Sequence, residues 1–265
     1  MTEIIAQTWL QRLDSAGSKL QCNQVHVIID QVGLDPLVAS GIQQMVPAMP
    51  WRALFEGWPE AAHGDLSPLL VRIDLDQPLQ RFWLEELISA FGHESRLLVL
   101  ISRWPFRRLG EYLGQCLQAR NGGGSGVLRY YDPRLFPLLF SHVLSAEQQQ
   151  PLLAPALLWS WLDRDGIPRH LAGTADTDCV DDPLPCELSD RQIDVLCCAA
   201  DAMKVQDELR ASLPQGWGAE QRFQACYRAV LDASEAGVFA KARYDAFILE
   251  HLQAAQAGPG TGGKA

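Results

Sequence analysis

The chain has 265 residues, 48% hydrophobic and 20% charged, which is enough apolar material for a core and excludes a globally disordered protein. Its net charge of −10 argues against a general nucleic-acid binder. The first ten residues lack the basic start and apolar stretch of a signal peptide, and no apolar run approaches the ~20 residues of a transmembrane helix, so we expect a cytoplasmic protein without membrane partners.

The first half of the chain alternates strand patterns with helical patterns. Residues 97–101 are apolar on both faces, which is typical of a central strand covered on both sides. Pro36 stands at an early helical position, and Gly92 is expected to end a helix. The predicted elements are strand 25–30, helix 35–45, strands 51–56 and 69–73, helix 79–91, strand 97–101, helix 106–119 and strand 127–131, with a further helix opened by Asp132 and Pro133.

Two glycine patterns fall in this half. Gly110 and Gly114 lie four residues apart in a predicted helix, and we interpret them as a place of close packing against the sheet. The tract 121–126 suggests a phosphate-binding loop, but such a loop follows a strand and opens a helix. Here the predicted order is helix, glycines, strand, and no G-K-[ST] follows. The sequence therefore favours a turn.

A hairpin is predicted further along, with strands at residues 157–162 and 167–171 around the turn dipeptide Asp165-Gly166. A calcium loop is the alternative for this acidic turn. A loop of the EF-hand type that starts at Asp163 would have Pro168 in place of its glycine and Thr174 in place of its bidentate glutamate. The hairpin turn is therefore favoured.

The composition changes after Gly173. Residues 174–188 are acidic, contain two prolines and show no periodicity, so they are predicted to be a linker. Ser189 and Gln192 form a capping box that opens a helical lobe over residues 189–255, and residues 256–265 are a predicted disordered tail. The predicted fold class is α+β: an N-terminal lobe, residues 1–173, with a mixed β-sheet flanked by helices, followed by an all-helical C-terminal lobe.

Charge is distributed unevenly along the chain. Residues 96–134 contain seven arginines against two acids, a balance of 7 − 2 = +5, whereas residues 176–194 contain seven acids against one arginine, a balance of 1 − 7 = −6. Exposed acids can speed the encounter with a basic partner surface, and we favour this role over docking of the two lobes. The candidate steering residues are Asp176, Asp178, Asp181 and Asp182.

Catalytic and metal-binding patterns are weak. The seven cysteines suit reduced thiols in a cytosolic protein, but they include no C-x-x-C pair, and adjacent Cys197 and Cys198 would point to different helix faces. His63 lies two residues from Asp65, yet no nucleophile is paired with it by motif. We predict no catalytic residue, no metal and no cofactor, although a hydrolase with a triad assembled in space stays open.

Several spaced motifs carry more information. They are E-G-W-P-E at residues 56–60, D-L-S-P-L-L-V-R at 65–72, the helical pattern that ends at Arg120, and Y-D-P-R at 131–134. In this order, over about residues 25–165, they resemble the signature of the adaptor chaperones of bacterial type VI secretion, the family called Tap or TEC. The glycine tract after Arg120 departs from the family, whose members often have charged residues there.

This resemblance implies an adaptor that holds a cognate toxin effector and loads it onto a VgrG spike protein, with a small co-chaperone left open as a further partner. An immunity-type toxin inhibitor and a hydrolase are the alternatives. The residues that it marks either build the scaffold or contact the partner, and we favour the scaffold role. In that role, Gly57 and Pro59 shape a bend, Asp132 and Pro133 cap a helix, and charged residues form ion pairs, namely Glu56, Glu60, Arg72 and Arg134. The marked residues are Glu56, Gly57, Pro59, Glu60, Asp65, Leu66, Arg72, Arg120, Tyr131, Asp132, Pro133 and Arg134.

Overall fold

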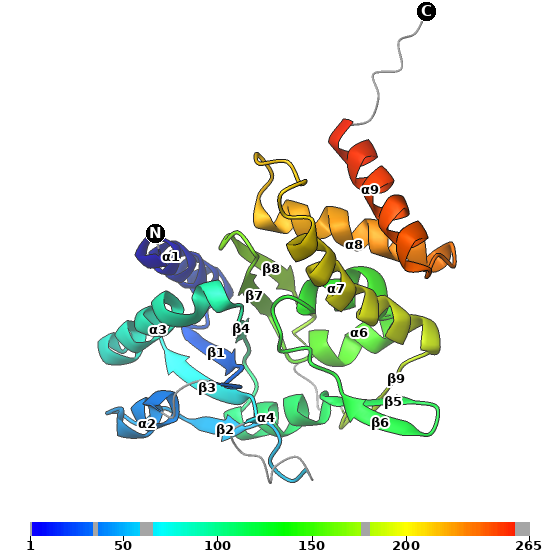
Figure 1. Cartoon of the computed structure of the whole chain (residues 1–265). Coiled ribbons are helices and arrows are strands. Elements are labelled where there is room, and N and C mark those ends of the chain that lie inside the picture. Colours follow the sequence, from blue (N-terminus) through cyan, green and yellow to red (C-terminus); the bar gives the residue numbers. More distant parts are fainter. Residues whose placement is uncertain (1, 34–36, 59–65, 176–180, 258–265) are drawn as a thin grey trace, which may run out of the picture. The chain divides into compact units, whose positions relative to one another are not determined.

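The computed structural model describes residues 2–33, 37–58, 66–175 and 181–257 (Figure 1). The chain divides into two compact units, Met1–Leu188 and Ser189–Ala265. The first unit combines sheets with helices and the second is helical, which confirms the predicted α+β fold class. The predicted helix start at Asp35 and Pro36 and residues 258–265 of the predicted tail lie outside the described residues.

The first unit is built on a six-stranded sheet with the order β2-β3-β1-β4-β7-β8, in which all neighbouring strands run antiparallel. A smaller sheet, with the order β6-β5-β9, pairs β5 with β6 antiparallel and with β9 parallel, so mixed pairing occurs there. The strands are β1 (Gln24–Ile29), β2 (Trp51–Ala53), β3 (Leu69–Asp74), β4 (Leu97–Ile101), β5 (Gln118–Asn121), β6 (Gly124–Val127), β7 (Leu158–Leu162), β8 (Pro168–Ala172) and β9 (Cys186–Glu187).

One face of the large sheet is covered by α1 (Thr2–Leu20) and α3 (Pro78–Phe91), which pack against each other. Val27 and Val99 are fully buried beneath them, in a core that includes Trp9. The Trp9 indole donates a hydrogen bond of 2.8 Å to Ser160 Oγ, so its one polar atom is satisfied inside the core. The α1 helix was not among the predicted elements.

The other face of the sheet carries Leu100 and Trp159, both fully buried. Phe136 packs on Trp159 with ring centroids 5.1 Å apart, and Tyr130 meets the same indole edge-on at 6.4 Å. Helix α4 (Phe106–Gln115) lies on this face as well. All five residues of β4 are buried, as their two apolar faces predict.

Glycines bring α4 close to the sheet, as the sequence predicts. A Cβ added at Gly110 would lie 2.8 Å from Arg52 Cδ, and one added at Gly114 would lie 2.9 Å from the carbonyl oxygen of Leu54. Both distances are shorter than ordinary van der Waals contact. A side chain at Gly114 would meet backbone and push the helix away, whereas the Arg52 side chain beside Gly110 can shift.

The segment after α4 differs from the prediction. The helix ends at Gln115 rather than at residue 119. Gly122 and Gly123 form the turn between β5 and β6, and Gly124 and Gly126 belong to β6. The predicted strand 127–131 is wrong beyond Val127, because Tyr130 and Tyr131 bury their rings against the core instead of continuing the ladder. A turn remains the correct interpretation of the tract: Gly122 has a φ of +55°, which glycine adopts without strain.

Other boundaries shift by a few residues. The strand predicted at 51–56 ends at Ala53, where the chain turns so that the Leu54 amide bonds the Pro68 carbonyl at 2.9 Å. The helix predicted from Asp132 begins at Phe136, and α5 (Phe136–Leu138) continues as a π-helix, Leu139–Val143. The remaining helices of this unit are α2 (Leu37–Gln44), a 3-10 turn at Gly92–Glu94 and α6 (Ala146–Leu153).

The β7–β8 hairpin confirms the prediction around Asp165 and Gly166. Gly166 has a φ of +73°, and its amide donates to the Asp163 carbonyl at 2.9 Å. The Asp163 carboxylate also accepts from the amides of Asp165 and Ile167, at 3.0 and 2.9 Å. The acidic side chains of this turn therefore organise the hairpin itself.

The second unit consists of α7 (Asp190–Glu208), α8 (Ala219–Glu235) and α9 (Lys241–Ala257). The capping box is confirmed, because Ser189 Oγ accepts from the Gln192 amide at 3.3 Å and the Gln192 side chain accepts from the Ser189 amide at 2.9 Å. Helix α8 packs against both of the others. Its buried residues are Phe223, Cys226, Tyr227, Ala229, Val230 and Ala233.

The α4 glycines yield a stability prediction. We expect Gly114→Ala to lower the free energy of unfolding by about 1–2 kcal/mol, because the added methyl meets a backbone oxygen that cannot rotate away. Gly41→Ala is the matched control within α2, since its Cβ would meet only Trp83 Nε1, at 3.4 Å. There the better helix propensity should raise stability by up to ~1 kcal/mol. Denaturant unfolding followed by tryptophan fluorescence measures both, and equal effects would contradict the close-packing role.

Candidate functional site

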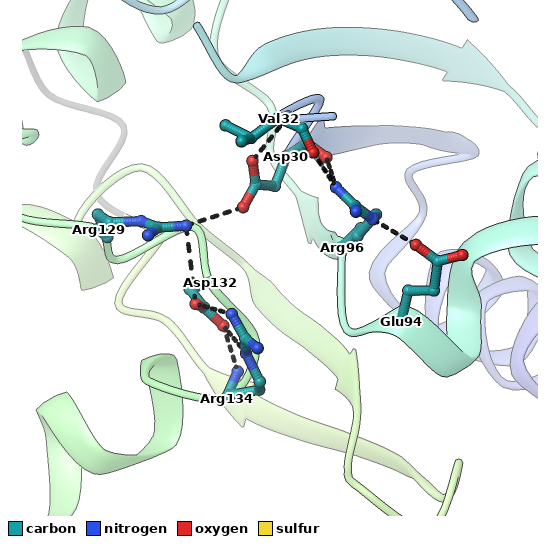
Figure 2. Close-up of polar contacts among 7 residues, drawn as sticks. All are labelled: Asp30, Val32, Glu94, Arg96, Arg129, Asp132 and Arg134. Carbon is teal, nitrogen blue, oxygen red and sulfur yellow. Dashed lines mark hydrogen bonds and ion pairs between the residues drawn. The ribbon is translucent and has the colours of Figure 1, made fainter. Parts of the chain in front are cut away.

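Two buried carboxylates hold two arginines where β1 ends (Figure 2). Arg129 Nη2 lies 3.0 Å from Asp30 Oδ2 and 3.9 Å from Asp132 Oδ2, so Arg129 bridges the two acids. Arg134 contacts Asp132 through two nitrogens, with Nη2 at 2.8 Å and Nε at 3.0 Å. The acid side chains are only 10% and 4% exposed, whereas Arg129 and Arg134 are 45% and 39% exposed.

The Y-D-P-R motif builds this cluster locally. Asp132 Oδ1 accepts from the Arg134 amide at 2.9 Å, which closes a turn over Pro133, and the Asp132 carbonyl accepts from the Phe136 amide at 2.8 Å. Arg129 also lies over the Tyr131 ring, 5.6 Å from its centroid. One short segment thus sets an acid between two cations and leads directly into α5.

The surroundings keep Arg129, Arg134 and Tyr131 in one charge state. The hydrogen bond to Asp132 raises the pKa of Arg134 above its already high usual value. Burial opposes the charge of Arg129, but Tyr131, Asp30 and Asp132 together raise its pKa, while burial raises the pKa of Tyr131. Arg129 and Arg134 therefore stay charged near neutral pH, and they suit fixed charge pairing rather than acid–base catalysis.

Arg96 extends the cluster toward β4. Its Nη1 donates to the carbonyl oxygens of Val32 at 2.6 Å and Asp30 at 3.3 Å, and its Nε lies 2.5 Å from Glu94 (Figure 2). The sequence motifs did not single out Asp30, Arg96 or Arg129. The closeness of Arg129 to the Y-D-P-R motif, two residues before Tyr131, could have marked it as a candidate. Nothing in the local pattern connects Arg129 with Asp30.

The E-G-W-P-E motif lies at a different part of the first unit. Glu56 Oε2 lies 3.1 Å from Arg52 Nε, and Gly57 turns the chain with a φ of +87°. Two adjoining recesses, of about 260 and 280 Å³, share Gly57, Trp58 and Gln118 in their walls. Both therefore lie against the turn that follows β2.

Arg120 lines the larger recess. Its Nη1 lies 3.9 Å from Glu187 Oε1, and both side chains are more than half exposed, so this ion pair is weak. The motif residues thus fall into two groups. Glu56, Gly57 and Arg120 border the recesses, while the Y-D-P-R residues form the arginine cluster.

Arg72 differs from the expectation of an ion pair. In the part of the chain that the structure describes, its guanidinium lies over the Phe106 ring, 5.8 Å from the centroid, and contacts no carboxylate. His26 pairs with Arg72 across the ladder of β1 and β3 and stacks on the same ring, with centroids 6.1 Å apart. The imidazole is 1% exposed, and neither ring nitrogen has a hydrogen bond of normal geometry to a described residue.

Burial lowers the pKa of His26 to about 3, and the charge of Arg72 acts in the same direction against a weak opposing effect from the Leu100 backbone. His26 is therefore neutral at physiological pH. Because a buried neutral imidazole beside a cation cannot readily accept a proton, His26 does not suit the role of a general base in this environment.

The remaining sequence-derived site residues are dispersed. Leu66 is 42% exposed. Asp181 and Asp182 are exposed, and Asp182 contacts Arg108 on α4, a bond that lowers the pKa of Asp182. Part of the acidic segment is thus neutralised within the first unit. Pro59, Glu60, Asp65, Asp176 and Asp178 lie outside the described residues.

Thiols and possible metal ligands offer little chemistry. Burial raises the pKa of Cys226 to about 11 and also raises the pKa values of Cys116 and Cys198, which keeps these thiols protonated. Within residues 2–33, 37–58, 66–175 and 181–257, no group of three His, Cys, Asp or Glu side chains could hold a metal ion. No helix in the same residues is long and apolar enough to span a membrane.

Comparison with known proteins adds one finding. Residues 25–150 match the model of a family described as a domain of unknown function (DUF4123), over slightly less than half of the chain. This stretch contains the E-G-W-P-E and Y-D-P-R motifs and most of the large sheet. Searches of curated proteins and of solved structures found no match.

The arginine cluster predicts a marked stability effect. Asp132→Ala removes the acceptor of the Arg134 amide and guanidinium and leaves a half-buried cation unpaired. We expect the free energy of unfolding to fall by about 2 kcal/mol. Asp201→Ala is the control, because among the described residues Asp201 forms an ion pair only with exposed Lys204, at 2.9 Å, and its loss should cost less than ~0.5 kcal/mol. Equal losses in chemical denaturation would show that the cluster does not stabilise the fold.

His26 predicts a pH dependence. Its pKa of about 3 in the folded chain lies below the value of about 6.5 expected when unfolded, so the unfolded state binds more protons between these values. The contribution of His26 to the free energy of unfolding is fully present above pH 6.5. It decreases as the pH falls, by about 2 kcal/mol at pH 5. His26→Leu should remove this part of the loss.

Unfolding free energies at pH 7.5 and pH 5 measure the difference. His170→Leu, a change at an exposed position on β8, serves as the control, because it keeps His26 in place and the loss attributed to His26 should remain. Identical pH profiles for wild type and His26→Leu would contradict the assignment of a buried, neutral imidazole.

Proposed function

We propose that the protein is an adaptor chaperone of a type VI secretion system, which binds a cognate toxin effector in the cytoplasm and loads it onto a VgrG spike protein. The observation that carries this proposal is the family match over residues 25–150, which coincides with the motifs that resemble Tap or TEC adaptors. Neither the family match nor the motifs depends on a catalytic residue.

The first unit offers chemistry that suits a binding role. Arg129 and Arg134 are fixed by buried acids yet keep more than a third of their side chains exposed, so they can meet a partner's carboxylates without reorganising. The recesses beside Trp58 offer a second contact surface. Two surfaces on one unit are what an adaptor needs in order to hold a toxin and engage a spike.

Transfer of cargo needs no turnover in this proposal. The adaptor grips the toxin in the cytoplasm and releases it when the spike complex provides a better fit, which is a difference between two binding free energies. The helical second unit is proposed to choose the toxin. Asp176, Asp178, Asp181 and Asp182 are proposed to speed the encounter with a basic partner surface, with Asp182 exchanging its contact with Arg108 for one with the partner.

The test is affinity purification of the tagged, full-length protein from its native cell, with the partners identified by mass. We expect one toxin, alone or together with its spike, to remain bound through gel filtration, since stable interfaces bury about 1,600 Å² in total. An unrelated protein with the same tag is the control. If no toxin or spike copurifies, the adaptor proposal fails.

Activity of the captured toxin separates the alternatives. An adaptor leaves the toxin's active site functional in the complex or after its release, whereas an immunity-type inhibitor blocks it. Turnover of a substrate by the purified chain alone would instead establish an enzyme. These assays use the same purified material, so one preparation decides among the three functions.

A further inference from the structure

The β5–β6 hairpin has a free outer edge. The Leu128 amide donates to the Leu117 carbonyl at 2.7 Å, and this bond fixes which residue pairs of the hairpin are hydrogen-bonded. Ala119 pairs in this way with Gly126, so Ser125 and Val127 direct their amides and carbonyls away from β5. Among the residues that the structure describes, these outward groups have no hydrogen-bond partner.

The other sheet edges of the unit are protected. Strand β2 has three residues and follows Pro50, and β8 begins at Pro168 and carries Arg169. Strand β9 has two residues, and the Gln148 side chain donates to the Glu187 carbonyl at 2.5 Å. Short length, proline and charge are the devices by which proteins prevent an edge from pairing with another chain.

Strand β6 is also short, with four residues, but it has neither of the other two devices. Its four residues, Gly-Ser-Gly-Val, include no charge and no proline, and Gly124, Ser125 and Gly126 are all exposed. Two glycines also leave the backbone without side chains to shield it. In Figure 1 the β5–β6 hairpin and β9 lie side by side, and β6 is the outer strand. The edge is therefore open for an added strand.

A side-chain recess adjoins this edge. Ser125 and Gly126 form one wall of the 280 Å³ recess, and Trp58, Arg120 and Pro185 contribute to the rest. Ser125 faces Arg120 across the ladder, so the recess opens on the face that carries both side chains. Because the Arg120–Glu187 pair is weak, Arg120 is available to a carboxylate that approaches along β6.

We propose that an extended segment of the toxin partner adds to β6 as a new strand. Its backbone bonds the free groups of Ser125 and Val127, one apolar side chain enters the recess beside Trp58, and an acidic residue meets Arg120. In this mode, main-chain hydrogen bonds give affinity, and alternate side chains give specificity. The inference rests on the proposed adaptor function and specifies the chemistry of the segment that is bound.

Ser125→Pro tests the edge directly. Proline removes an outward amide and leaves the bonds between β5 and β6 in place, so the fold should be retained. We expect the full-length variant to melt at the wild-type temperature and to bind the copurified toxin at least about tenfold more weakly. Hydrogen exchange of the Ser125 and Val127 amides should slow when the toxin binds to the wild-type protein.

His170→Pro is the matched control, because the ladder of β7 and β8 directs the His170 amide outward on another edge. It should bind the toxin as the wild type does. Ser125→Ala, which keeps the amide, should also bind normally. Arg120→Glu should weaken binding, whereas Glu187→Gln should leave it unchanged or strengthen it.

The outcomes separate this inference from the proposed function. If the wild type captures a toxin but Ser125→Pro binds it with unchanged affinity, the strand-addition proposal is wrong and the adaptor function stands. If no toxin is captured by the wild type, both fail. A wild-type dimer in sedimentation that Ser125→Pro converts to a monomer would overturn the proposal in favour of pairing between two copies. If Ser125→Pro fails to fold, the wild-type complex provides the test. Unchanged hydrogen exchange of the Ser125 amide on toxin binding would then overturn the strand-addition proposal.

Discussion

The close approach of α4 to the turn after β2 is the constraint on which the candidate surfaces depend. Gly114 allows the helix to lie against the Leu54 carbonyl, and the chain then turns through Gly57 so that Trp58 borders the recesses. The end of the same helix leads directly into β5. A side chain at Gly114 would therefore displace the turn and the hairpin together, because interiors at native packing density transmit strain rather than absorb it.

Ion pairs hold the other candidate surface, the arginine cluster, in place. Asp30 and Asp132 are buried, and a buried acid is tolerated only when it is paired and hydrogen-bonded. Their partners Arg129 and Arg134 are consequently held in place while their outer parts stay in water. The scaffold and partner-contact interpretations of the motif are thus compatible: the acids stabilise the structure, and the cations that they position remain available to another protein. Removal of an acid tests the first role only.

Local patterns predicted the elements whose burial follows from their own residues. The strand at 97–101 and the capping box at Ser189 depend on side chains within a few positions of each other. The strand expected at 127–131 fails because Tyr130 packs on Trp159, a contact 29 residues away that no local period encodes. Likewise, the pairing of Asp30 with Arg129 joins positions 99 residues apart, so sequence spacing alone could not find it.

The arginine cluster and the edge of β6 would contribute differently to binding. Exposed guanidinium groups act at a distance of about one Debye length and mainly raise the rate of encounter, an effect that salt weakens. Free backbone groups on β6 act only at contact, where several aligned bonds slow dissociation. An adaptor that must find its cargo quickly, hold it and then release it gains from this division.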